Sequence, residues 1–154
     1  MLAASIMRLH LLGEIMLKQL TYASRANRVM NIMDMNDILK ISRANNAALG
    51  ITGSLCLHDD MFVQQLEGAV SVVDALYERI VQDPRHRDAT VVVMSDIPRR
   101  RFDQWSMGLL VEDQDNRYIF DKHSPTGKFA PFTMGVANSR AFFSEIRDHT
   151  RWIS

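Results

Sequence analysis

Two polar side chains of this sequence lie on strand faces that are otherwise apolar, and both could move a proton. Leu20 and Tyr22 alternate with their neighbours so that they share one face of a strand. Gln64 likewise shares a face with Phe62 and Leu66. A buried amide is costly unless it is hydrogen-bonded, and it can both donate and accept. The pattern predicts either a structural tyrosine–glutamine network or a polar planar ligand held beside the two side chains.

Two adjacent asparagines, Asn45 and Asn46, close a predicted helix over residues 34–48 whose apolar stripe faces the sheet. Asp34 is the predicted N-cap, and Gly50 is expected to end the helix in a left-handed conformation. The asparagine side chains are expected either to cap this helix or to hold the same planar ligand.

The chain lacks the motifs of ordinary hydrolytic and dinucleotide-dependent enzymes. It contains no GxGxxG, P-loop or GxSxG sequence. Its five histidines are scattered, without the spacing of metal ligands, so no metal site is predicted. The single cysteine, Cys56, is predicted to be packed on a strand face rather than to act as a nucleophile. These absences argue against an enzyme.

The charge balance removes the broad electrostatic case for a dedicated nucleic-acid binder, because Lys+Arg and Asp+Glu both number 18, and it leaves only local basic patches to consider. Two basic clusters, 85–87 and 99–101, are predicted to be solvated loop charge rather than contacts to an anion or an acidic partner. A membrane-spanning helix needs roughly 20 apolar residues, and no such run is present. With one cysteine as well, a cytoplasmic location without membrane contact is expected.

The elements that must position these side chains follow an order common in α+β domains. The 154 residues fit one domain, and the first 15 are predicted to be an extension. The predicted elements are strands at 17–24, 51–58, 61–68, 90–97 and 105–111 and helices at 34–48 and 71–82. A hairpin turn at Asp59–Asp60 joins the second and third strands, and Ser71 with Asp74 is predicted to form a capping box. The order β-α-β-β-α-β-β predicts a ferredoxin-like five-stranded sheet with two helices on one face.

The opposite face of such a sheet needs a cover. Residues 112–135 are predicted to be loop-rich because they contain Pro125, Gly127 and Pro131. Residues 137–152 are predicted to form a helix whose apolar residues include Phe142 and Ile146. This helix is expected to pack on the open face or against a partner.

Five fragments, taken together and in order, resemble the BLUF domain, a flavin-binding blue-light sensor. They are LTYAS, SRANNAALGITGSL, FVQQLEG, YERIVQDPRH and RRRFDQWSMG. The resemblance extends over residues 16–111, with 1–15 as an N-terminal extension and 112–154 as a C-terminal loop and helical extension. The whole is similar to short, single-domain BLUF proteins.

The resemblance implies a role for particular residues. Tyr22 matches the tyrosine that donates an electron to photoexcited flavin, and Gln64 matches the glutamine between that tyrosine and the flavin. Trp105 and Met107 match strand residues that relay the signal, and Met107 is expected to share its strand face with Trp105 and Leu109. The implied cofactor contacts are Tyr22, Asn45, Asn46, Gln64, Arg79, Asp83 and His86. The flavin is expected between the two helices, non-covalently bound, as FAD, with FMN or riboflavin as alternatives.

The function implied is a photoreceptor that signals through the last strand and the C-terminal helix to an unidentified downstream protein, with self-association into an oligomer. No direct contact with nucleic acid is expected. The alternatives are a flavin-binding redox enzyme on the same fold and, if no flavin binds, a purely structural interaction domain. The absence of a general base and a nucleophile favours the sensor.

Overall fold

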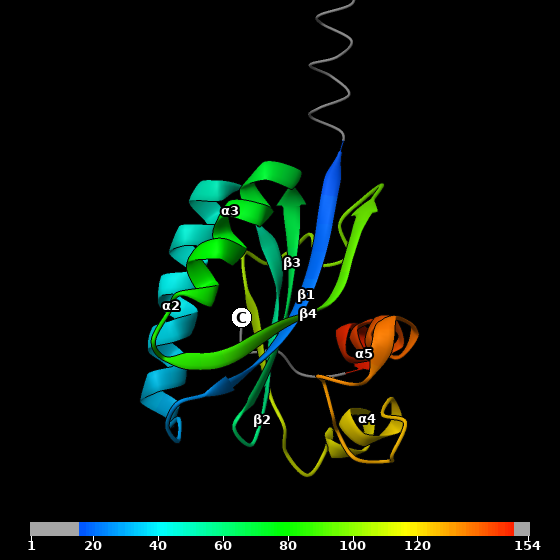
Figure 1. Cartoon of the computed structure of the whole chain (residues 1–154). Helices are drawn as coiled ribbons and strands as arrows, with labels where there is room; N and C mark the ends of the chain where they lie inside the picture. The colour runs from blue at the N-terminus through cyan, green and yellow to red at the C-terminus, as the bar shows by residue number, and fades with distance from the viewer. Residues whose placement is uncertain (1–15, 150–154) are drawn as a thin grey trace, which may run out of the picture.

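The computed structural model of the chain describes residues 16–149, so the predicted extension at 1–15 and the end of the last predicted helix lie outside the described residues. The elements are β1 (Leu17–Ala26), α2 (Ile32–Leu49), β2 (Thr52–His58), β3 (Met61–Ala69), α3 (Val70–Val81), β4 (His86–Ile97), β5 (Gly108–Val111), α4 (Arg117–Lys122) and α5 (Gly135–His149). The predicted order of strands and helices in the core is confirmed (Figure 1).

The five strands form one mixed sheet in the order β4-β1-β3-β2-β5. β1 pairs antiparallel with both β3 and β4, and β5 pairs parallel with β2. The register of β1 on β3 places Leu20 opposite Leu66 and Tyr22 opposite Gln64. Side chains that are directly opposite on one face of a sheet are in contact distance, so Tyr22 and Gln64 are neighbours.

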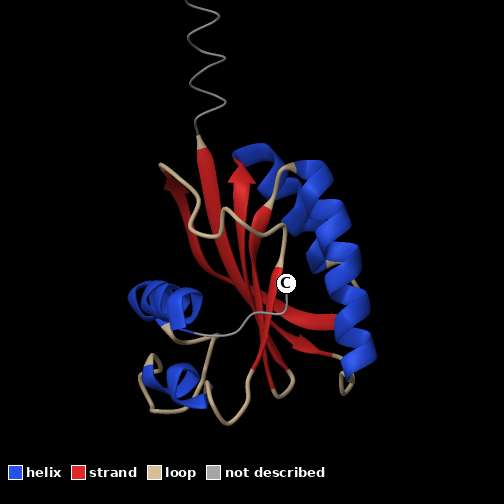
Figure 2. Ribbon diagram, turned by 180° about the vertical axis from the view of Figure 1, so that it is seen from behind, coloured by secondary structure: helices blue, strands red, loops and turns tan. Residues whose placement is uncertain are grey.

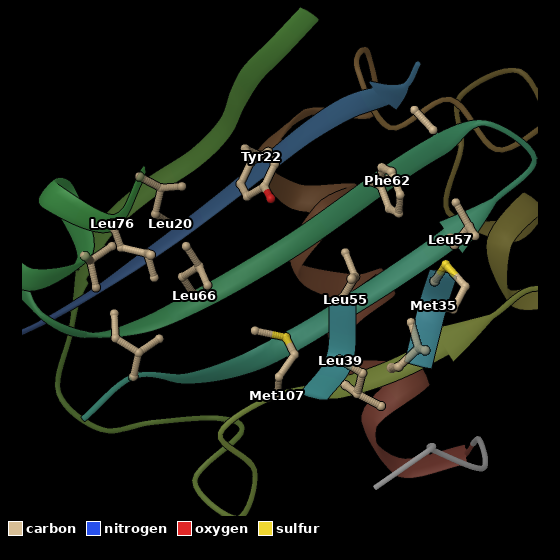
Figure 3. Packing of buried hydrophobic residues seen from close by; sticks show 14 residues of the cluster. Leu20, Tyr22, Met35, Leu39, Leu55, Leu57, Phe62, Leu66, Leu76 and Met107 are labelled. Carbon is tan, nitrogen blue, oxygen red and sulfur yellow. The ribbon is translucent and has the colours of Figure 1, made fainter. Parts of the chain in front are cut away.

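Helices cover both faces of the sheet, α2 and α3 on one side and α4 and α5 on the other (Figures 1 and 2). Two apolar cores result. The core under α2 and α3, which we call the helix-side core, contains Leu20, Tyr22, Met35, Leu39, Leu55, Phe62, Leu66, Leu76, Met107 and Leu109 (Figure 3). The core under α4 and α5, the C-terminal core, contains Cys56, Val63, Phe102, Leu110, Ile119, Phe120, Phe142, Phe143 and Ile146. The predictions that Cys56 is packed and that the C-terminal helix covers the open face are confirmed.

The start of α2 differs from the prediction. Asn31, not Asp34, is the N-cap, and Asp34 stands three residues later in a reciprocal capping box. The Asp34 N–H donates to Oδ1 of Asn31 at 2.9 Å, and the Asn31 N–H donates to the Asp34 carboxylate at 3.0 Å. At the other end, Gly50 has the expected left-handed conformation, with φ of 66°.

The capping box predicted at Ser71 and Asp74 is wrong. α3 follows β3 without a loop, so its N-cap is Ala69, which makes no side-chain capping bond. Asp74 instead forms an ion pair with Lys18 of β1. This pair ties α3 to the sheet beside the helix-side core.

The larger of the remaining differences concern two strands and one predicted loop. β4 begins at His86 instead of residue 90, and β5 begins at Gly108 instead of residue 105. The predicted loop of 112–135 contains α4, which buries Ile119 and Phe120 completely in the C-terminal core. Burial of this apolar pair stabilises a short helix in a stretch whose composition favours loops. Within residues 16–149, no helix is long and apolar enough to cross a bilayer.

Candidate functional site

A cavity of about 420 Å³ lies between the helices α2 and α3 and the sheet. Apolar side chains such as Ile38, Leu55 and Phe62 form much of its wall. The seven residues expected to contact a cofactor all line it: Tyr22, Asn45, Asn46, Gln64, Arg79, Asp83 and His86. A mainly apolar cavity with a few converging polar groups is the usual form of a small-molecule site.

The central polar feature of this cavity is a chain of hydrogen bonds from Tyr22 through Gln64 to Met107. The Tyr22 hydroxyl donates to Oε1 of Gln64. The Gln64 amide in turn donates from Nε2 to Sδ of Met107 at 3.4 Å. Burial raises the pKa of Tyr22 well above its usual range, so its phenol is neutral at any physiological pH. A neutral donor and an amide are therefore aligned on the cavity wall.

Two side chains of α2 hold the segment that leads into β5. Nδ2 of Asn46, which is buried, donates to the carbonyl of Ser106 at 2.8 Å. Nε of Arg43 donates to the carbonyl of Met107 at 2.9 Å. The expectation that asparagine side chains cap α2 is therefore wrong for Asn46, since backbone N–H groups of Gly50 and Ile51 make the C-cap bonds. Asn45 is exposed and lines the cavity.

The end of α3 and the start of β4 bring charged groups to the cavity. Arg85 donates to both carboxylate oxygens of Asp83, and this guanidinium holds the pKa of Asp83 below its usual range. Arg85 is exposed in a turn, as predicted for solvated loop charge, and it is also paired with Asp83 and lines the cavity. His86 contacts the Ile80 carbonyl through Nε2, and its ring centre lies 6.3 Å from that of Tyr22. Within the described part of the chain, no group of His, Cys, Asp and Glu could hold a metal ion.

The two predicted relay residues, Trp105 and Met107, lie before β5 and on different sides of the sheet. Met107 is completely buried in the helix-side core with Leu109. Trp105 packs against the C-terminal core, with its ring 5.9 Å from that of Phe102. The expectation that Met107 shares a strand face with Trp105 is wrong, because the segment before Gly108 has left the regular strand geometry.

A buried carboxylate fixes the path of this segment. Glu67 of β3 is completely buried and accepts from Nε2 of Gln19 at 3.2 Å. It also accepts from the backbone N–H of Arg101 at 2.7 Å and of Phe102 at 3.3 Å. Arg100 donates to the Thr52 hydroxyl and to the backbone carbonyls of Glu67 and Gly50. The prediction of solvated charge over 99–101 is therefore wrong for Arg100, which bonds to β2, β3 and the end of α2. These bonds hold Phe102 in the C-terminal core.

Replacing Glu67 with glutamine is expected to lower the free energy of unfolding by about 1–3 kcal/mol, since charge-assisted bonds to buried N–H groups are lost. Urea unfolding measures this change. Hydrogen exchange at the amides of Arg101 and Phe102 should become faster. The matched control is Glu78→Gln on the exposed face of α3, which should leave both measurements unchanged; an equal effect of the two substitutions would contradict the role given to Glu67.

Two serines that line the cavity, Ser24 and Ser42, were not among the predicted site residues. Ser24 could have been found, because it lies two residues after Tyr22 on the same strand face. Ser42 lies on the predicted helical stripe, between Ile38 and Asn45. Neither serine gives a signal of its own, because small hydroxyl residues are common in strands and helices.

Residues 17–108, which include the whole cavity wall, match the family described as BLUF, sensors of blue-light using FAD. The chain belongs to the BLUF family. Subunit beta of the photoactivated adenylate cyclase of Euglena gracilis is 39% identical over 102 residues, which are 66% of this chain. The chain spans only 12% of the length of that relative.

Solved BLUF structures share the fold. The structure of BlsA in its photo-activated state superposes with a TM-score of 0.81 at 29% identity, covering 90% of this chain and 99% of BlsA. The dark-state structure of the BLUF protein BlrB gives a TM-score of 0.63 at 35% identity, covering 68% of this chain and 80% of BlrB. The predicted α+β fold and family are confirmed.

The cavity is chemically suited to a flavin. An isoalloxazine ring is flat and largely apolar, with carbonyl and ring-nitrogen atoms along one edge. The cavity has apolar walls, amide groups from Asn45, Asn46 and Gln64, and the buried hydroxyl of Ser24, which has no hydrogen-bond partner among the described residues. An unsatisfied buried hydroxyl on a residue that lines a cavity is a group that a polar ligand atom could complete. These residues therefore fit the flavin that the family description implies.

Proposed function

We propose that the chain is a blue-light photoreceptor in which Tyr22 and Gln64 are the light-responsive pair. They lie beside a non-covalently bound flavin, for which FAD is the first candidate. The observation that carries this proposal is the hydrogen-bond chain from Tyr22 through Gln64 to Met107 on the cavity wall. It joins a group that can lose an electron and a proton to a residue that directly precedes β5.

The chemistry of the pair follows from burial. Flavin, when bound and excited by blue light, supplies a strong one-electron oxidant. Tyr22 gives up one electron, and because a buried phenol cation is costly at low dielectric, its proton follows through the Gln64 amide. Oε1 of Gln64 accepts this proton while Nε2 releases one toward the ligand, so the amide carries no net charge. When the electron and the proton return to Tyr22, Gln64 is left rotated or tautomerised. Either state points a new donor toward the ligand, which lowers the excitation energy and gives a small, reversible red shift.

The same rearrangement carries the signal. In the structure described, Nε2 of Gln64 donates to Met107, so a change in the amide removes this bond or replaces it. Met107 is followed directly by β5, and Glu112 just beyond β5 donates its N–H to the carbonyl of Leu57 at 2.9 Å and forms an ion pair with Arg117, the first residue of α4. β5 thus links the cavity to α4 and α5, which we propose transmit the signal to a downstream protein or to a second copy of the chain.

Replacing Met107 with alanine is expected to preserve the red shift and to abolish light-dependent change in residues 112–149, because Gln64 loses its link to β5. Hydrogen exchange in the dark and under blue light measures both regions. Met107→Leu keeps the apolar volume without the sulfur acceptor, and the same loss there would show that the bond matters rather than packing. Survival of the C-terminal light response in both variants would contradict this relay.

The first experiment on the function is an absorption spectrum of the purified protein in the dark, after blue light and during recovery. A flavin spectrum that shifts to the red and relaxes in the dark supports the photoreceptor. Bound flavin that bleaches or never shifts overturns it and favours the redox enzyme. A protein that neither contains flavin nor takes it up overturns both.

A further inference from the structure

We propose that Ser24 is a further flavin-binding residue, whose hydroxyl forms a hydrogen bond with a polar atom of the bound flavin; this rests on the proposed function. Ser24 is completely buried and lines the cavity. Its Oγ has no hydrogen-bond partner among the residues that the structure describes. Buried hydroxyls are normally satisfied, so this one points to a partner that the protein itself does not provide.

The position of Ser24 in the sheet directs its side chain toward the ligand. It follows Tyr22 by two residues on β1, so both side chains stand on the face covered by α2 and α3. Phe62, its partner on β3, also lines the cavity. Ser24 therefore lies on the same cavity wall as Tyr22.

The pairing of β1 with β4 is irregular at this point. Ala23 is opposite Thr90 and Arg25 is opposite Arg87, so β4 carries one extra residue across from Ser24. Asp88, one of the two β4 residues at this bulge, has a φ of 58°, in the left-handed region. Figure 1 shows β4 bending along its length. Bulges bend a strand and are over-represented both at sheet edges, where β4 lies, and next to active sites.

A second buried serine offers a matched comparison. Ser54 of β2 is also completely buried, and its hydroxyl also lacks a partner among the described residues. It does not line the cavity, because it alternates with Leu55 and stands on the face of Cys56. Ser24→Ala and Ser54→Ala therefore each remove one completely buried hydroxyl group. Only the first of these substitutions changes a residue that lines the cavity.

The test is a titration of the flavin-depleted full chain with riboflavin, followed by quenching of riboflavin fluorescence. Ser24→Ala is expected to weaken binding by about 10-fold, because a flavin atom loses its partner. Ser54→Ala should remain within about two-fold of the unchanged protein. In urea unfolding without flavin, both variants should be at least as stable as the unchanged chain, since each loses an unsatisfied polar group.

The outcomes separate this inference from the proposed function. If the unchanged chain binds riboflavin and Ser24→Ala binds it equally well, the role of Ser24 is overturned and the photoreceptor stands. If both serine variants lose affinity equally, a general packing effect replaces the direct contact, which also overturns it. Failure of the unchanged chain to bind any flavin overturns the proposed function itself.

Discussion

Replacing Tyr22 with phenylalanine is expected to abolish the light-induced red shift while the protein still binds flavin. The substitution removes only the hydroxyl, which donates to Gln64 and carries the proton. Phenylalanine keeps the ring in the helix-side core but is much harder to oxidise and has no proton to transfer. The shift should therefore be lost completely, whereas the free energy of unfolding should fall by only about 1 kcal/mol, the usual value of one hydrogen bond.

Tyr77 provides the matched control for this substitution. Its ring centre lies 5.4 Å from that of Tyr22, and it packs against the same core. Tyr77 does not line the cavity, so Tyr77→Phe should retain the red shift. Dark and lit absorption spectra of the two variants decide the matter. A shift that survives in Tyr22→Phe and disappears in Tyr77→Phe would show that the wrong tyrosine has been assigned.

The sequence predicted the strand faces well because a strand has a period of two. Tyr22 and Gln64 were expected beside apolar residues of their own strands, and the observed register places them directly opposite each other. Alternation alone reports which face a side chain occupies, but not which strand lies beside it. The pairing of the two residues became predictable only through the fold, in which β1 and β3 are adjacent.

The segment before β5 was less predictable because distant residues determine its path. The sequence around Trp105 is consistent with a strand, and alternation would put Trp105 and Met107 on one face. The Glu67 carboxylate instead binds the N–H groups of Arg101 and Phe102, and Phe102 is buried in the C-terminal core. A bond between residues about 35 positions apart leaves no periodic signal in the local sequence.

Helix starts show a similar limit. Asp34 carries the right chemistry for an N-cap, but it serves as the third residue of the helix because Asn31 can accept from its N–H. Ser71 and Asp74 have capping-box spacing, yet β3 continues to Ala69 and leaves no turn in which Ser71 could cap. Local motifs predict that a helix begins nearby, and the length of the preceding strand decides where.

Replacing Gln64 with leucine is expected to have the largest effect of the single substitutions, because Gln64 is the middle member of the hydrogen-bond chain. Leucine approximates its volume but can neither accept from Tyr22 nor donate to Met107. The buried phenol hydroxyl is left unsatisfied, which should cost about 1–3 kcal/mol of stability. The red shift and the light-dependent hydrogen exchange of residues 112–149 should both disappear, whereas Met107→Ala should remove only the second.

The neighbouring Gln65 provides the matched control for the Gln64→Leu substitution. Gln65 is also buried, but it faces the other side of β3 and donates to the Thr21 hydroxyl at 3.2 Å. Gln65→Leu therefore introduces the same change of side chain one residue away and should keep both light responses. If Gln64→Leu retained a reversible red shift, the amide of Gln64 could not be its origin, and the contacts from α2 through Asn46 would be the next place to look for it.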